Sequence, residues 1–144
     1  MADDRAALLA TLASFPGRLG VAARRAAVGP PPPAGEWGPA EVVRHLIAVE
    51  REVHQARLHD LSTQDGPTWS WTEPGPWPGE PTLTLDGVLA RFAADRATTV
   101  RMLETLDDAG WARTGTHTRL GVWDVAGLVR NAVTHDEEHL AGLG

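Results

Sequence analysis

Two histidines near the end of the chain are spaced to bind one metal ion. His135 and His139 stand four residues apart, and in an α-helix that spacing places both rings on one side, a single turn apart. Two imidazoles arranged in this way can direct their nitrogens at one divalent cation. Two ligands leave the site incomplete, so the rest of the sequence must supply at least one more.

His45 is the residue that helix geometry favours as the third ligand. It lies on an apolar helical stripe, three residues after Val42 and four before Val49, so its ring should face the interior. His54 follows about two and a half helical turns later, and we expect it to point the opposite way. His59 returns to the same side but should lie about 21 Å farther along the axis. Neither is expected to join a site built at His45.

Apolar periodicity predicts four helices. The expected ranges are residues 3–28, 39–61, 84–110 and 122–140. A turn segment at 111–121 contains His117, which periodicity cannot orient, and no stretch shows a convincing strand pattern. The sequence therefore predicts an all-α fold: one domain over residues 1–144, a four-helix bundle, up-and-down with a long crossover loop.

The expected crossover, residues 62–81, is unusual in length and composition. It contains Trp69, Trp71 and Trp77 together with five prolines, and it has no periodicity. Long loops of this kind in compact domains often carry function. Two interpretations follow: the tryptophans plug the open end of the helices, or the loop is a lid that faces a substrate.

The composition restricts the classes of function. A net charge of −6 disfavours a non-specific grip on nucleic acid. Cysteine is absent, so a transition-metal site must use histidine with aspartate or glutamate. Residues 1–5 show no signal peptide, and no apolar stretch approaches the ~20 residues of a membrane span. We therefore expect a cytoplasmic protein that acts on a small molecule, with no nucleic-acid or membrane partner.

Several short motifs, in their order along the chain, resemble one known family. They are GEWGPAEVVRHL from Gly35 to Leu46, Phe92 with Arg96, LGVWDV from Leu120 to Val125, and the final His-x-x-x-His. Together they span nearly the whole chain and resemble the DinB/YfiT-like superfamily. The resemblance implies a four-helix bundle, often a homodimer, with a metal site whose ligands fall on His45, His135 and His139. Characterised relatives include thiol-dependent S-transferases and a mycothiol-dependent isomerase.

Three neutral imidazoles leave at least one position on a metal open, as in catalytic sites. Histidine ligands suit Zn²⁺, Ni²⁺, Fe²⁺ or Mn²⁺. Such an ion could activate a bound water for hydrolysis, or hold a low-molecular-weight thiol as a thiolate for S-transfer. The residues leave this choice open, and the resemblance favours a thiol-dependent S-transferase acting on a small electrophile. The alternatives are a non-catalytic stress-response bundle that binds metal or a small ligand, and a dimeric scaffold with a decayed site.

Two further side chains are weaker candidates for substrate binding. Arg96, on the inward side of the third helix, either holds an anionic group of the substrate or forms a buried ion pair. Trp37 either packs at the start of the second helix or lines a pocket. No catalytic acid or base is assigned, because the nearby carboxylates are expected to be solvated or to complement helix dipoles: Glu41, Glu52, Asp136 and Glu138.

Overall fold

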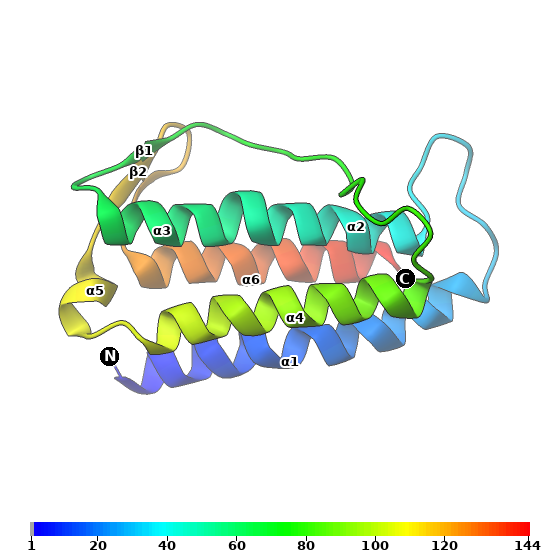
Figure 1. Cartoon of the computed structure of the whole chain (residues 1–144), viewed down its shortest axis with the longest axis horizontal. Helices are drawn as coiled ribbons and strands as arrows, with labels where there is room; N and C mark the ends of the chain where they lie inside the picture. The colour runs from blue at the N-terminus through cyan, green and yellow to red at the C-terminus, as the bar shows by residue number, and fades with distance from the viewer. Residues whose placement is uncertain (1) are drawn as a thin grey trace.

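Four long helices form the body of the protein. The computed structural model describes residues 2–144, and side chains from residue 4 onward. The helices are α1 (Ala2–Ala27), a continuous second helix of three segments, α4 (Leu85–Glu104) and α6 (Val125–Gly142). The second helix consists of α2 (Pro39–Val49), the π-helical segment η1 (Glu50–Gln55) and α3 (Ala56–Thr63). The predicted all-α four-helix bundle is confirmed (Figure 1).

The long crossover sets the directions of the helices. Figure 1 shows α2–α3 running from the end of the molecule near the C-terminus toward the opposite end, and α4 running the same way. Residues 64–84 must therefore return along the length of the bundle before α4 can begin. α1 packs against α4, α6 and α2, and α2 packs against α4 as well.

Hydrogen bonds hold the crossover against the bundle. The guanidinium of Arg44 on α2 donates to three backbone carbonyls of the crossover, those of Trp77, Gly79 and Glu80. The buried Trp69 donates its indole N–H to Asp60 at 3.0 Å. Trp69 packs within the core and Trp77 packs against it, whereas Trp71 is 50% exposed. Trp69 and Trp77 therefore pack against the helices, in line with the first interpretation of the loop, whereas Trp71 remains at the surface.

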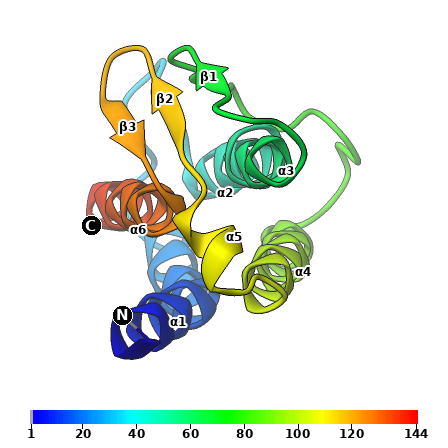
Figure 2. The ribbon, with the colours of Figure 1, turned by 90° about the vertical axis from the view of Figure 1, so that its left-hand side faces the viewer.

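The expectation that the chain lacks strands is wrong. β1 (Thr68–Trp69) pairs in parallel with β2 (Gly115–His117), which forms an antiparallel hairpin with β3 (Gly121–Trp123). Figure 2 shows this small sheet beside α3 and α6. Strands of two and three residues are too short for an alternating pattern to reveal them. Gly115 is required because a Cβ there would lie 2.4 Å from the Trp69 ring.

Capping side chains displace two of the predicted helix boundaries. The Asp124 carboxylate accepts a hydrogen bond of 2.8 Å from an amide in the first turn of α6, so this helix begins at Val125 and not at residue 122. The Asp107 carboxylate likewise accepts a hydrogen bond of 2.8 Å from an amide in the first turn of the short helix α5 (Asp108–Ala112). The third long helix therefore ends at Glu104 and not near residue 110.

α1 is long and apolar enough to cross a membrane by length and composition alone. Residues 4–27 contain a window of mean hydropathy 1.4, so the expectation that no stretch approaches a membrane span is wrong on that measure. The measure is weak, because core helices and signal sequences also satisfy it. In the bundle, α1 buries Leu12, Phe15 and Leu19, and Phe15 packs edge-on against Phe92 with ring centroids 5.9 Å apart.

The π-helical segment η1 changes the phase of the second helix. In a π-helix each hydrogen bond spans five residues instead of four, so a turn holds more than 3.6 residues. One additional residue corresponds to about 100° of helix rotation. His54 therefore does not lie opposite His45, as an uninterrupted α-helix would require. Its side chain is 4% exposed and faces the interior, so the prediction that it points away is wrong.

A buried arginine joins the helices at the middle of the bundle. Arg96 of α4 makes paired hydrogen bonds to Glu50 of η1, both at 3.0 Å, and to Asp136 of α6, at 2.8 and 2.9 Å. Arg96 also donates to the Leu12 carbonyl of α1 at 3.1 Å. As whole residues, Arg96, Glu50 and Asp136 are only 1–2% exposed. One side chain thus ties α1, η1, α4 and α6 together.

This network favours one of the two interpretations of Arg96. Its donors are taken up by two carboxylates and a carbonyl, which makes it the centre of a buried ion pair and leaves it little capacity for a substrate. Burial alone would lower the pKa of Arg96, but the charges and hydrogen bonds of Glu50 and Asp136 raise it above its usual value. The expectation that Asp136 is solvated is wrong, because Arg96 holds its carboxylate in the core.

Replacing Arg96 should strongly destabilise the fold. Arg96→Met leaves two buried carboxylates without their partner, and we expect the free energy of unfolding to fall by about 3–5 kcal/mol. Chemical denaturation followed by circular dichroism measures this loss. Arg101→Met, at an exposed position on the same helix, is the matched control and should change stability by no more than about 0.5 kcal/mol. Equal effects of the two substitutions would contradict the role assigned to the network.

Candidate metal centre

The three predicted ligands meet in one cluster. His45 of α2 and His135 and His139 of α6 lie beside Glu73 of the crossover, and one ligand atom from each lies within 4.8 Å of the others. The ring centroids of His45 and His139 are 4.7 Å apart, and those of His45 and His135 are 5.5 Å apart. The structure thus brings together the three imidazoles chosen from the sequence, while metal binding itself stays a prediction.

A backbone carbonyl fixes the orientation of His45. The Nδ1 atom lies 2.7 Å from the Pro74 carbonyl oxygen, and because a carbonyl can only accept, Nδ1 must carry the proton. In the neutral ring, Nε2 then presents a lone pair to the cluster. This atom is buried and has no hydrogen-bond partner among the described residues. Trp37 packs over the ring with centroids 4.9 Å apart and is itself 40% exposed. An imidazole held through its other nitrogen in this way is typical of a metal ligand.

His135 and His139 place their Nε2 atoms 3.2 Å apart. At that distance the two nitrogens must share a proton or a cation, because two facing lone pairs repel each other. The Nδ1 atom of His135 is buried without a hydrogen-bond partner among the described residues. Buried nitrogens that lack partners carry a desolvation cost of about 1–3 kcal/mol each. A divalent ion at the cluster would satisfy Nε2 of His45 and would relieve the repulsion between facing lone pairs of His135 and His139.

Glu73 was missed by the sequence analysis. Its carboxylate oxygen lies 3.7 Å from Nε2 of His45, and its side chain is 53% exposed. The residue sits in a proline-rich segment without periodicity, so no local pattern assigns it to the cluster. A carboxylate beside three imidazoles adds an oxygen ligand, or a base, at the side of the cluster that faces solvent.

The surroundings keep the two imidazoles of α6 neutral. Burial, with the neighbouring histidines, lowers the pKa of His135 to about 3. Burial and the nearby His45 also lower the pKa of His139. A histidine binds a metal ion only when the ligating nitrogen is deprotonated. The histidines on α6 are therefore in the protonation state that ligation needs at neutral pH.

Comparison with known proteins places the fold in a family. A sequence profile of the DinB superfamily matches residues 3–142. The chain belongs to the DinB superfamily. Among solved structures it is similar to YfiT from Bacillus subtilis, described as a probable metal-dependent hydrolase with an unusual four-helix bundle topology. The identity is 19%, with a TM-score of 0.73 over 96% of this chain and 83% of YfiT. No curated protein matches the sequence.

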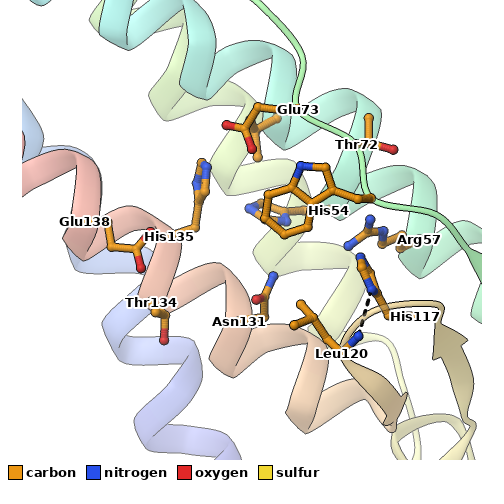
Figure 3. A pocket seen from close by; sticks show the side chains of 12 residues that line it. His54, Arg57, Thr72, Glu73, His117, Leu120, Asn131, Thr134, His135 and Glu138 are labelled. Atoms are coloured by element: carbon orange, nitrogen blue, oxygen red, sulfur yellow. Dashed lines mark hydrogen bonds between the residues drawn. The ribbon is translucent and has the colours of Figure 1, made fainter.

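A cleft opens from the cluster of this DinB-superfamily protein. It has a volume of about 240 Å³ and is formed by α2–α3, α6, the crossover and the β2–β3 hairpin. Figure 3 shows His135, Glu73 and Glu138 at one end, His54 in the middle, and Arg57 with His117 at the other end. The cluster therefore has an adjoining space in which a small molecule fits.

His54 enters this cleft because of η1. Its ring centroid lies 6.2 Å from that of His135. Burial lowers the pKa of His54 to about 4, against the opposing influence of the Glu50 charge. The bundle of this DinB-superfamily protein thus holds another buried, neutral imidazole, that of His54, beside the three predicted ligands. The only trace in the sequence is the histidine itself, since the apolar pattern does not reveal a π turn.

Acidification should destabilise the metal-free protein through His54. The unfolded chain takes up a proton with a pKa near 6.5 whereas folded His54 resists protonation to about 4, so stability falls as pH drops through this window. The slope from one such group approaches about 1.4 kcal/mol per pH unit. His54→Gln should flatten the dependence of the free energy of unfolding, measured with urea between about pH 5 and pH 7.

His59→Gln provides the control, because this histidine lies exposed on α3 of the same helix. It should leave the slope of wild type unchanged. The shared contribution of Asp136, whose pKa burial raises to about 6, cancels when variant and wild type are compared. A slope in His54→Gln identical to that of wild type would show that the buried imidazole does not resist protonation.

Proposed function

We propose that this protein is a metal-dependent enzyme in which His45, His135 and His139 bind a divalent transition-metal ion. The observation that carries the proposal is the convergence of three imidazoles from two helices, with a buried ring nitrogen of His45 that has no hydrogen-bond partner within the described part of the chain. Imidazole and carboxylate ligands suit Zn²⁺, Ni²⁺, Fe²⁺ or Mn²⁺, and the donor set alone does not select among them.

The chain supports this centre in two ways. The Pro74 carbonyl holds His45 in the tautomer that leaves Nε2 free. Asp136 follows His135 directly, and its ion pair with Arg96 fixes the rotation of α6 that aims both of that helix's histidines. When bound, the ion supplies a Lewis acid that makes a coordinated water or thiol easier to deprotonate.

Glu73 is the residue best placed to accept that proton. It borders the cluster on the exposed side, and its carboxylate belongs to the crossover rather than to the rigid helices. Water as the nucleophile gives hydrolysis of a small electrophilic substrate held in the cleft. The similarity to YfiT, which is described as a probable metal-dependent hydrolase, supports this form of the proposal.

A low-molecular-weight thiol is the second candidate nucleophile, giving a thiol-dependent S-transferase. The half-exposed Glu73 favours it, because the exposed side of the cluster lies within reach of a thiol whose larger part stays in solvent. The resemblance of the sequence motifs to the DinB/YfiT-like superfamily supports the same reaction. Assays with a nitrophenyl ester, and with chlorodinitrobenzene plus a thiol, separate the two reactions.

Removing a ligand should remove the metal. Protein purified without a histidine tag should contain close to one equivalent of metal by elemental analysis. Loss of a residue that only supports a ligand weakens metal binding by about 10–100-fold. His139→Ala removes a ligand itself, so it should weaken Zn²⁺ binding by more than this. His59→Ala, at an exposed position, should retain the wild-type content. Less than about a tenth of an equivalent in wild type, unrestored by added Zn²⁺ or Ni²⁺, would refute the metal centre.

Removing the charge of Glu73 tests whether it is the base. Glu73→Gln should lower kcat by about 100-fold or more while the metal content stays unchanged, because the amide cannot accept a proton. Glu52→Gln, an exposed carboxylate on η1, is the control and should keep wild-type activity. Loss of metal in Glu73→Gln would instead identify the residue as a ligand.

A further inference from the structure

Arg57 is a buried cation without a counterion in the cleft. Its side chain is 7% exposed and borders the cleft at the end away from Glu138 (Figure 3). Within the described part of the chain, Arg57 donates one hydrogen bond, from Nη2 to the Ser70 carbonyl oxygen at 3.3 Å. Its guanidinium also lies over the Trp69 ring, 5.6 Å from the centroid. No carboxylate of the described residues pairs with it, and a guanidinium has five N–H donors. Most of its hydrogen-bonding capacity is therefore free.

His117 adds a neutral donor beside Arg57. Its Nδ1 atom accepts hydrogen bonds from the backbone amides of Arg119 and Leu120, at 3.1 and 3.2 Å. Because Nδ1 accepts, the proton of the neutral ring must sit on Nε2, which becomes a donor. Burial, followed by the charges of Arg57 and Arg119, lowers the pKa of His117 and keeps the ring in this form.

Asn131 places an amide in the middle part of the same cleft, below His54 in the view of Figure 3. It lies on α6, one turn before His135, and lines the same cleft (Figure 3). Its side chain makes no hydrogen bond to the part of the chain that the structure describes. Three donors from three separate elements, α3, β2 and α6, thus line one cleft with capacity to spare.

We propose that Arg57, the Nε2–H of His117 and the amide of Asn131 bind a carboxylate group of the substrate, whose reactive group lies at the metal cluster. This inference rests on the proposed function and names the class of its substrate: a small monocarboxylate that bears an electrophilic group. A guanidinium and neighbouring neutral donors match the geometry of a carboxylate, which accepts several hydrogen bonds in one plane.

The charged side chains that line the cleft favour a substrate with a single negative charge. Arg57 is the one cation among the residues that line it, whereas Glu73 and Glu138 stand at the other end. A second negative charge at the Arg57 end, as on a phosphate monoester, would meet no second arginine among the residues that line the cleft. The volume of about 240 Å³ likewise suits a small acid.

Benzoate and its neutral analogue benzamide test the carboxylate site directly. The full chain, with its metal content measured in the same sample, is titrated with each and followed by the backbone-amide NMR signals of Thr72 and His117, which line the cleft and are unchanged in every variant. Benzoate should bind saturably and at least tenfold more tightly than benzamide. Arg57→Met should weaken benzoate at least tenfold, because a hydrogen-bonded charge pair contributes this much or more. Arg130→Gln, an exposed arginine on α6, makes the same change in net charge and should have no effect.

Asn131→Asp is a second variant that does not remove a buried side chain. It supplies Arg57 with an internal carboxylate and should abolish the benzoate preference. Equal binding of benzoate and benzamide, or benzoate affinity unchanged in both variants, would overturn the inference even if metal binds. Tighter binding of inorganic phosphate than of benzoate would overturn the carboxylate assignment. Absence of metal together with Arg57-dependent benzoate binding would refute the metal centre and leave the carboxylate site standing.

Discussion

Burying the Arg96 guanidinium between two carboxylates constrains several long helices at once. Paired hydrogen bonds to Glu50 and Asp136 use the planar guanidinium in two directions, and such geometry tolerates little rotation of either partner. Asp136 takes no part in the proposed chemistry, but it is the residue next to His135. Glu50 is the first residue of the π-helical segment that follows α2. The alignment of imidazoles from α2 and α6 therefore depends on a charge network that lies behind them.

The crossover supplies what the helices alone lack. The helices provide imidazoles on rigid supports, whereas this segment adds a carboxylate, a carbonyl for His45 and part of the cleft wall. Its backbone is held at both ends, by Arg44 near Trp77 and by strand pairing near Trp69. A segment fixed in this way can place Glu73 reproducibly although it has little regular structure. The division resembles that of many sites in which a stable scaffold carries functional loops.

The sequence predicts those parts of the site that obey helical periodicity. His45, His135 and His139 lie on apolar stripes, so their inward direction follows from spacing alone. His54 lies within the π turn and Arg57 follows it. Because this turn leaves no mark in the apolar pattern, an α-helical phase assigns them wrongly or not at all. Glu73 belongs to an aperiodic segment. The ion pairs of Arg96 join residues 40 and 46 positions apart, and local patterns cannot pair them.

The π turn has a consequence for comparisons within the DinB superfamily. One additional residue is accommodated inside an otherwise continuous helix, and everything after it is rotated relative to α2. Deleting a single codon in this stretch would preserve the imidazole of α2 while presenting different side chains to the cleft. Relatives that share the bundle can therefore differ in the molecules they accept through an insertion or deletion at one position, without any point substitution.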